Sequence, residues 1–285
     1  MQVKIEPMIN SDSAIALLCC PTCGGDLRAL NDSSGSAEAL HCTSCQSHYP
    51  INDNIIDFVP DFQPSEGLAQ RFMESPLVVD VYESFFRPAF TSLGSTIKYQ
   101  DEDQWLDALD NQHGLTQVDV VLDLAAGTGR YSRKMIDRYQ PKTLIAADLS
   151  MPMLKKHQEI SKGLGYDEML YIRADAHHLP IKSAVVNRLN CFGALHLFPA
   201  PAQAIKELGR VAADTAVLSC LIACEHQSPI KKRLQAAFSQ LASFHFFQRD
   251  VLQEDLENAG FKQFENMQKQ MLMMFSAVKP TNSDN

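Results

Sequence analysis

Four cysteines near the start of the chain are spaced as metal ligands. Cys20 and Cys23 form one Cys-x2-Cys pair, and Cys42 and Cys45 form a second pair after a separation of eighteen residues. Two such pairs can present four thiolates tetrahedrally to Zn²⁺. Because no ligand position is left open, we predict a structural zinc ribbon rather than a catalytic metal site. A disulfide pair or unrelated buried thiols is the alternative interpretation.

Three acidic residues stand where apolar runs end. Asp123, Asp148 and Asp175 end successive runs, and Gly127 and Gly129 follow the first of them. The carboxyl ends of parallel strands lie at one edge of a sheet, where open α/β sheets bind ligands. A row of acids beside a glycine turn suits a ligand with a ribose diol, an adenine amine and a cationic group, and it suits a pyrophosphate poorly. For each acid alone, a solvated helix cap is the alternative.

The elements that would position these acids alternate along the chain from residue 118. Buried strands are predicted at 118–124, 143–149, 169–175, 185–192 and 216–224, and helices at 132–139, 151–160 and 201–211. Short apolar strands alternating with amphipathic helices predict an α/β fold with a doubly wound, mostly parallel sheet.

The composition divides the chain into three predicted segments. Residues 1–60 are expected to form the zinc ribbon, and 61–117 a helical connector or lid, with helices after Ser75-Pro76 and at 101–110. A catalytic domain follows at 118–280, with a helical insert near 229–247.

Three sequence segments together resemble a known enzyme family. DLAAGTGR, ADLS and ADAHHLP are similar, in that order, to motifs I, II and III of class I S-adenosylmethionine-dependent methyltransferases. FGALHLFPAPAQAIKELGRV resembles the segment after the fourth strand in small-molecule methyltransferases. Ala125 replaces the usual first glycine of motif I, a proline-glycine turn is missing after Arg210, and Val186-Asn187 stands where Phe-Asp is usual. The resemblance covers about residues 118–280 and implies the seven-stranded class I methyltransferase fold.

The resemblance implies S-adenosylmethionine as the cofactor. The glycine turn would lie under its methionine part, Asp148 would accept both ribose hydroxyls, Leu149 and Met153 would cover the adenine, and Asp175 would read the adenine edge. The cofactor-binding residues that it implies are Asp123, Ala125, Ala126, Gly127, Gly129, Asp148, Leu149, Met153, Asp175, Ala176 and Asn190.

Methyl transfer needs a general base only when the acceptor keeps its proton at neutral pH. His196, just past the fourth strand, is the candidate catalytic base, and a packing or capping histidine is the alternative. His177-His178 is interpreted as a surface pair. Aromatic residues could close over the site and favour a small or medium-sized organic acceptor, although ordinary core would explain them equally well. They are Tyr82, Phe85 and Phe86, next to Arg87, and those of the insert at 235–247.

Charge and composition narrow the partners. The chain has 285 residues and a formal charge of −9, and residues 1–60 hold seven acidic against two basic residues, a formal charge of −5. A ribbon so acidic is poorly suited to phosphates, so nucleic acid is an unfavoured partner and a protein partner for the ribbon fits better. We expect no membrane association and a reducing, cytoplasmic location, because no run of about 20 apolar residues and no secretory signal is present.

The ribbon-plus-methyltransferase layout is similar both to ribosomal RNA guanine-N1 methyltransferases and to uncharacterised bacterial and plastid methyltransferases. The favoured hypothesis is methyl transfer to a small or medium-sized organic acceptor. One alternative is an RNA base methyltransferase. It is supported by basic residues at 231–233 and on the helix that carries Arg130, Arg133, Lys134 and Arg138. The other alternative is a non-enzymatic cofactor-binding protein.

Overall fold

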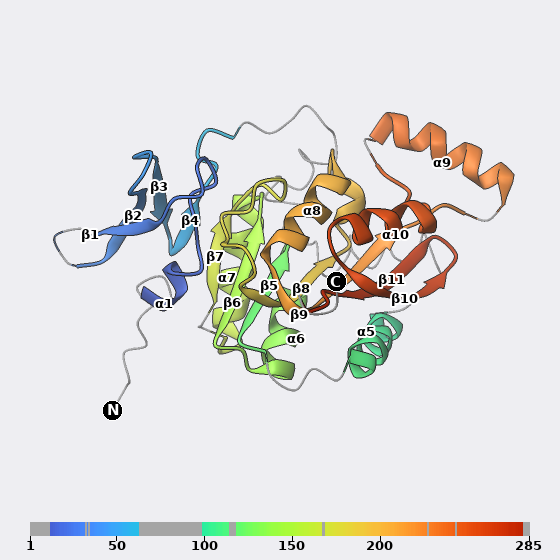
Figure 1. Cartoon of the computed structure of the whole chain (residues 1–285), viewed down its shortest axis with the longest axis horizontal. Coiled ribbons are helices and arrows are strands. Elements are labelled where there is room, and N and C mark those ends of the chain that lie inside the picture. The colour runs from blue at the N-terminus through green and yellow to red at the C-terminus, as the bar shows by residue number, and fades with distance from the viewer. Residues whose placement is uncertain are drawn as a thin grey trace.

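A computed structural model describes residues 12–31, 33, 35–62, 99–113, 118–166, 169–226, 228–242 and 244–281 of the chain. Within these ranges one continuous sheet of eleven strands crosses the molecule, in the order β1-β2-β3-β4-β7-β6-β5-β8-β9-β11-β10 (Figure 1). The strands are β1 (Leu27–Asn31), β2 (Ala37–Cys42), β3 (His48–Asn52), β4 (Ile55–Asp57), β5 (Val120–Leu124), β6 (Thr143–Asp148), β7 (Leu170–Arg173), β8 (Val186–Phe192), β9 (Ala212–Ala223), β10 (Lys262–Lys269) and β11 (Leu272–Val278).

The seven strands β5 to β11 are contiguous in this sheet, from β7 to the edge strand β10, and are called the central sheet. β7, β6, β5, β8 and β9 run parallel to one another, and β11 and β10 are added in antiparallel pairing. The five predicted strands agree with β5 to β9 to within a few residues. The predicted class of an α/β fold with a doubly wound, mostly parallel sheet is therefore confirmed.

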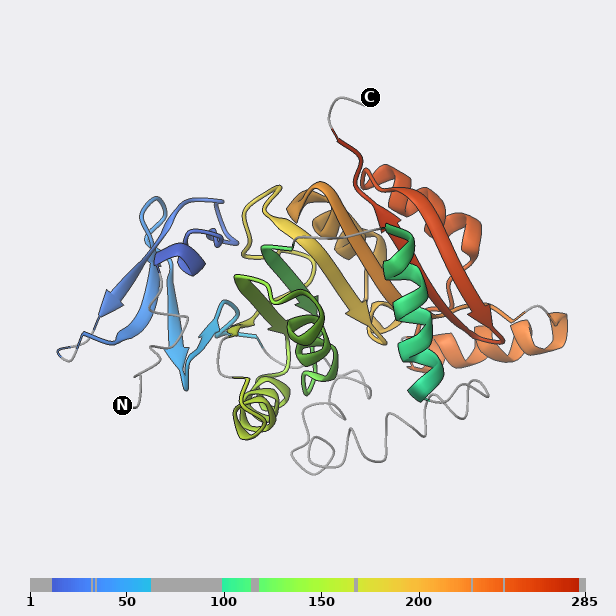
Figure 2. The ribbon, with the colours of Figure 1, turned by 90° about the horizontal axis from the view of Figure 1, so that it is seen from below.

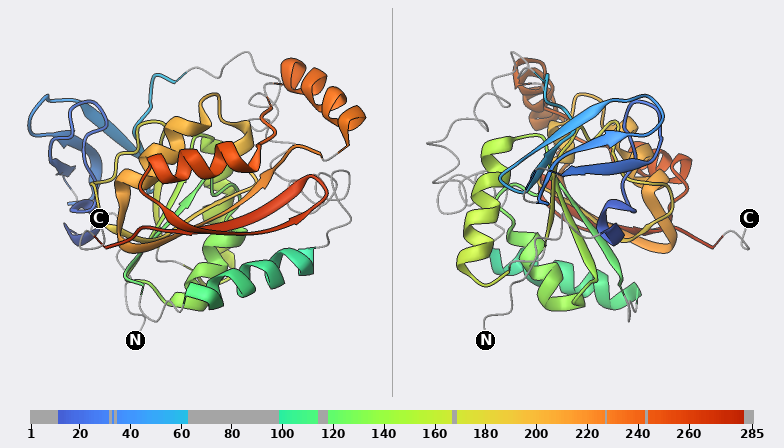
Figure 3. Two further views of the ribbon diagram at one scale, coloured as in Figure 1. Left: turned by 45° about the vertical axis from the view of Figure 1, so that its right-hand side comes forward. Right: turned by 90° about the vertical axis from the view of Figure 1, so that its left-hand side faces the viewer.

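Helices cover both faces of the sheet. α5 (Tyr99–His113), α6 (Arg130–Tyr139) and α7 (Met151–Gly163) lie on one face, and α8 (Pro201–Val211) and α10 (Arg249–Asn258) lie on the other, as Figures 2 and 3 show. Prolines in their first turns help to start α7 and α8, because a proline there has no backbone N–H to leave unpaired. The short elements α1 (Asp12–Ile15) and the 3-10 turn η3 (Leu195–Leu197) complete this part of the fold.

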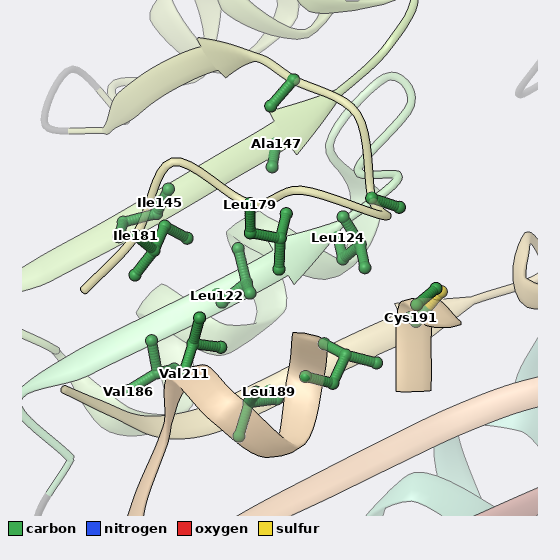
Figure 4. Close-up of a cluster of buried hydrophobic side chains, with 14 of the residues drawn as sticks. Leu122, Leu124, Ile145, Ala147, Leu179, Ile181, Val186, Leu189, Cys191 and Val211 are labelled. Carbon is green, nitrogen blue, oxygen red and sulfur yellow. The ribbon is translucent and has the colours of Figure 1, made fainter. Parts of the chain in front are cut away.

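Both faces of the central strands are buried. Leu122 and Leu189 contribute to the apolar cluster on the α8 side, part of which Figure 4 shows, whereas Val121 and Leu144 face the α5–α6–α7 side with Met135. Successive strand residues point to opposite faces, so a strand covered on both sides must be apolar throughout. This requirement explains the uninterrupted apolar run that precedes Asp123.

The N-terminal segment is joined to the central sheet by backbone pairing. β4 pairs in parallel with β7, with Ile56 opposite Ile172 and Asp57 opposite Arg173, and β3 connects β4 to the hairpin of β1 and β2. A second contact is the antiparallel bridge between Leu18 and Ile181. The segments before and after the predicted boundary near residue 60 therefore contribute strands to one continuous sheet.

Part of the predicted connector lies outside the described residues. This part includes the helix expected after Ser75-Pro76 and the lid residues Tyr82, Phe85, Phe86 and Arg87. The second connector helix, predicted at 101–110, is confirmed as α5 and extends beyond both of those ends. Helix α9 (Pro229–Ala242), which extends away from the sheet in Figure 1, lies within the predicted insert at 229–247, and no helix continues over 244–247. In the ranges described above, no helix combines the length and apolar character needed to cross a bilayer.

Gly129 closes the turn between β5 and α6 against a buried histidine. It caps α6 with a φ of 85°, in the left-handed region that favours glycine. A Cβ on Gly129 would lie 2.0 Å from the imidazole of His157, whose side chain is fully buried in α7. Burial, together with the charge of Arg133, lowers the pKa of His157 to about 3, so the ring is neutral at physiological pH. The turn after β5 can therefore pack on α7 only if residue 129 has no side chain.

We predict that Gly129→Ala destabilises the fold by about 3 kcal/mol, combining left-handed strain of ~1–2 kcal/mol with overpacking of ~1–3 kcal/mol. Gly165 is the matched control, because it shares the φ of 85° and a Cβ there would meet nothing within 4 Å. Gly165→Ala should cost only the strain. Urea denaturation measures both changes, and equal losses of stability would contradict the role given to His157.

Candidate functional site

The carboxyl ends of β5 to β8 surround one cavity. Most of the residues that line it come from the loops that follow these four strands, and Phe62 joins them from the N-terminal segment. The lining residues are Phe62, Asp123, Leu124, Ala125, Ala126, Gly127, Thr128, Tyr131, Asp148, Leu149, Ser150, Met153, Ala174, Asp175, Ala176, His177, Phe192, Gly193, Ala194, Leu197, Phe198 and Pro199. Nine of the eleven predicted cofactor-binding residues are among them.

The turn after β5 presents backbone to the cavity. Ala125 has a φ of 55° and Gly127 a φ of 54°, so both are left-handed, like Gly129 at the end of the turn. Ala125 tolerates this conformation at a cost of roughly 1–2 kcal/mol, strain of the kind that accumulates at binding sites. Asp123 is buried behind the turn and accepts a hydrogen bond from the Ser132 hydroxyl at 2.6 Å. Its carboxylate therefore helps to hold the start of α6 against the end of β5.

Asp148 connects the glycine turn to the end of β6. One of its oxygens accepts from the Gly127 N–H and the other from the Ser150 N–H, each at 2.8 Å. Burial raises the pKa of Asp148 from its ordinary value, and the N–H groups of Ser150 and Gly127 counteract that rise. Each carboxylate oxygen has a second lone pair, so the group can also accept two ribose hydroxyls.

His177 belongs to the cavity, contrary to its interpretation as a surface residue. Its Nδ1 lies 2.6 Å from an Asp175 oxygen that also accepts the His177 backbone N–H at 2.9 Å. The His177 side chain is 15% exposed and lines the cavity, whereas His178 is exposed as predicted. The Asp-x-His spacing was the available signal, because a turn brings residues two apart onto one carboxylate.

Two predicted cofactor residues do not line the cavity. Gly129 is the N-cap residue of α6 and is not among the lining residues. Asn190 is fully buried in β8 beside Asp123, and neither polar atom of its side chain has a hydrogen-bond partner among the described residues. A buried amide of this kind is satisfied by a ligand or by water in most proteins. The buried amide of Asn190 therefore indicates that a polar group of a ligand could bind near the end of β5.

The structure does not bring His196 to the cavity lining. Its Nδ1 accepts the backbone N–H of Ala223 at 3.4 Å, and its ring packs on Phe244 with the centroids 4.7 Å apart. Burial and the neighbouring His245 lower the pKa of His196 to about 4, so its imidazole is neutral at pH 7. This geometry matches the packing alternative, and a catalytic role for His196 stays a hypothesis.

Two stacked aromatic rings form a wall that the sequence did not single out as part of the site. Tyr131, from the first turn of α6, stacks on Phe192 at the end of β8, with centroids 4.1 Å apart and an interplanar angle of 24°. Its hydroxyl donates to the buried carboxylate of Glu102 in α5 at 2.7 Å. The sequence signal was the position of Tyr131 two residues after the glycine turn, where a helix side chain can face the ligand.

The four predicted metal ligands are brought together at a separate site. The Sγ atoms of Cys20, Cys23, Cys42 and Cys45 all lie within 4.8 Å of one another. Tetrahedral Zn–S bonds of about 2.3 Å require sulfur separations of roughly 3.8 Å, so the cluster has the size of a zinc site. A Cβ on Gly25 would meet the Cys42 sulfur at 3.0 Å, which shows how closely the first knuckle packs on the second.

Comparison with known proteins agrees with this geometry. Residues 121–215 match the family described as a methyltransferase domain. A protein of Arabidopsis thaliana described as an uncharacterized chloroplastic methyltransferase is 25% identical over 92% of this chain and 77% of its own length. A demethylmenaquinone methyltransferase of Lactiplantibacillus plantarum is 29% identical over 53% of this chain and 68% of its own.

A solved structure shares the fold. Phosphoethanolamine N-methyltransferase 2 of Haemonchus contortus, in complex with phosphomonomethylethanolamine and S-adenosylhomocysteine, superposes with a TM-score of 0.54 at 12% identity. The match covers 61% of this chain and 52% of that one, and at this identity it bears on the fold alone.

We predict that Asp148→Ala weakens binding of S-adenosylhomocysteine by about 1.5–3 kcal/mol, the range for hydrogen bonds to a charged group. Calorimetry on the purified chain measures the dissociation constant, and thermal denaturation checks that the variant is folded. Asp119→Ala is the matched control. Asp119 is an exposed acid that pairs with Lys142. It directly precedes β5, at the end of the strand that is farther from the cavity. Unchanged affinity in Asp148→Ala would contradict the assignment of the ribose site.

Proposed function

Because this chain carries a class I methyltransferase domain, we propose that it transfers the methyl group of S-adenosylmethionine to a small or medium-sized organic acceptor. The observation that carries the proposal is the single cavity in which Asp123, Asp148 and Asp175 surround a glycine turn beside an aromatic wall. When bound there, the cofactor would supply a methyl group on a positively charged sulfonium.

The residues of the cavity account for the three parts of this cofactor. The left-handed turn at Ala125 to Gly127 leaves backbone room for the methionine part, and Asp148 retains lone pairs for the ribose. Leu149 and Met153 offer an apolar face to the adenine, with the Ala176 amide and Asp175 at its edge. Alignment of acceptor and methyl group by such a site can lower the barrier by as much as ~7–11 kcal/mol.

The acceptor side of the cavity is aromatic and apolar. Tyr131 and Phe192 form one wall, and Leu197 at the end of η3, with Phe198 and Pro199 after it, forms another. Such a lining favours an acceptor with a flat or apolar body over a highly charged one. The relative named for demethylmenaquinone supports an organic ring as acceptor, as does the absence of any strongly basic residue among the lining residues.

The RNA alternative is weakened by the charge environment of α6. Arg130 pairs with Asp103 at 2.9 Å, Lys134 pairs with the same carboxylate, and Arg138 pairs with Asp107. These acids belong to α5, so the basic face that the sequence offered to RNA is largely compensated within the protein. Phosphate binding would have to compete with these ion pairs in addition to the acidic ribbon.

We predict that labelled S-adenosylmethionine, incubated with the purified chain and cell extract, transfers label to the small-molecule fraction. RNA and protein are separated from that fraction and counted, and Asp148→Ala serves as the inactive control. Label in RNA that disappears after ribonuclease treatment would favour the RNA alternative. Binding of S-adenosylhomocysteine by calorimetry without turnover in any fraction would favour the non-enzymatic cofactor-binding protein. A protein partner for the N-terminal segment and a cytoplasmic location stay predictions.

We also propose that the cysteine cluster holds one structural Zn²⁺. Cys42 accepts hydrogen bonds from the backbone N–H groups of Ser44 and Cys45 at 3.4 and 3.5 Å, and the Tyr49 hydroxyl lies 3.0 Å from the Cys20 sulfur. Donors directed at the sulfurs stabilise thiolates, as they do around metal sites. Four thiolate ligands leave no open coordination position, so the ion would stabilise the β1–β3 region without taking part in methyl transfer.

We predict one zinc per chain by elemental analysis of protein purified under reducing conditions. Cys42→Ser should abolish it, because a hydroxyl is a poor zinc ligand. Cys19→Ser is the matched control, since Cys19 is buried in the same stretch but outside the cluster, and it should retain the metal. Two metals per chain, or none, would contradict a single four-cysteine site.

A further inference from the structure

The end of β4 carries a buried carboxylate next to the cofactor end of the central sheet. Asp57 is 6% exposed and is the register partner of Arg173 at the end of β7. An Asp57 oxygen accepts from the Arg173 guanidinium at 3.0 Å. Its other oxygen accepts the Val59 N–H at 3.0 Å, so Asp57 also shapes the turn that follows β4. A buried ion pair in this position joins the N-terminal segment to the domain that binds the cofactor.

Arg173 also contacts two residues that line the cavity. Its Nε donates to the backbone carbonyl of Leu149 at 3.0 Å, directly after the ribose-binding Asp148. Its guanidinium carbon lies 5.8 Å from the ring centroid of Phe62, within range of a cation–π contact. One side chain therefore contacts both the loop after β6 and the residue that the N-terminal segment contributes to the lining.

Phe62 is directed toward the cavity by its local turn. Its backbone N–H donates to the Val59 carbonyl at 3.0 Å, and that carbonyl also accepts from Arg173 at 3.3 Å. The ring is half-buried and lines the same cavity as Leu149 and Met153. Since Arg173 contacts both the Phe62 ring and the Leu149 backbone, these two residues lie at the same end of the cavity, the end that faces β6 and β7.

We propose that Phe62 is a cofactor-binding residue that stacks on the adenine, and that Asp57 and Arg173 are positioning residues that hold Phe62 and Leu149 around it. The inference rests on the proposed function, because it concerns the adenine of the same cofactor. An aromatic ring stacks on a base through its flat apolar face, and Phe62 can offer such a face in the same cavity as Leu149 and Met153. The N-terminal segment would thereby complete the cofactor site in addition to any role of its metal.

The test measures binding of S-adenosylhomocysteine and of 5′-methylthioadenosine, which has the adenine but no amino-acid part, to the full chain by calorimetry. Phe62→Ala should weaken both ligands by a similar factor of about ten, as expected for loss of one base–aromatic contact. Phe62→Trp should retain affinity to within about threefold, because it keeps an aromatic face. Equal affinity of Phe62→Ala and the unaltered chain for both ligands would overturn the proposal.

Asp57→Asn tests the positioning pair. It should weaken both ligands several-fold, and its effect should be clearly smaller in a Phe62→Ala background, because the two residues act through one contact. Asp53→Asn is the matched control: Asp53 lies in the turn between β3 and β4 and pairs with Lys155 of α7, but the pair is exposed. Its φ of 53° suits asparagine. Asp53→Asn should leave both affinities unchanged.

Thermal denaturation separates a purely structural role from positioning. If Asp57→Asn lowers the melting temperature while both dissociation constants stay unchanged, the positioning role is wrong. If Phe62→Ala raises only the KM of an acceptor, Phe62 belongs to the acceptor subsite and the adenine assignment is wrong. If the unaltered chain binds no S-adenosylhomocysteine, the proposed function fails and the inference fails with it. If the unaltered chain binds this ligand and Phe62→Ala binds it equally well, only the inference is wrong.

Discussion

The hydrogen bond from the Gly127 N–H to the Asp148 carboxylate is the contact on which the cavity depends. It joins the turn after β5 to the end of β6, so that two strand ends become one surface. The same carboxylate also accepts the Ser150 N–H, where Ser150 caps α7. A single buried acid thus orients the glycine turn and the start of a helix, and it still has lone pairs for a ligand. These two bonds explain why an acid stands at the end of β6, where an apolar strand would otherwise continue.

The packing behind this contact is equally constrained. Gly129 can approach His157 only without a Cβ, and the neutral His157 ring occupies the space between α7 and the turn. On the other side of α6, Tyr131 reaches the buried Glu102, and the ion pairs of Arg130 and Arg138 hold α5 against α6. The position of the aromatic wall therefore depends on a helix that precedes, in sequence, the residues that match the methyltransferase family. The basic residues of α6 resemble a nucleic-acid-binding face in the sequence, but in the structure they form ion pairs that connect α6 to α5.

The N-terminal segment extends the same sheet. β4 pairs with β7 through backbone hydrogen bonds, and the Asp57–Arg173 ion pair lies where this extension meets the carboxyl ends of β6 and β7. A small segment gains stability by adding its strands to a larger sheet, because the edge strand of that sheet is then paired as well. None of the four cysteines is among the residues that line the cavity. This arrangement supports a structural rather than a chemical role for a metal there.

The sequence by itself determined the α/β class, the five parallel strands, the cysteine cluster and most of the cavity, because these features depend on local patterns. Apolar runs that end in Asp123, Asp148 and Asp175 predict strand ends, and parallel strands place their ends together wherever the chain goes between them. Tertiary structure alone decided which loop side chains face the cavity. His196 packs against Phe244 while His177 contacts Asp175, and Phe62 comes from the turn after β4, far away in sequence. These outcomes depend on contacts between segments that no local pattern relates, so strand periodicity could predict the edge of the sheet but not the side chains that complete the site.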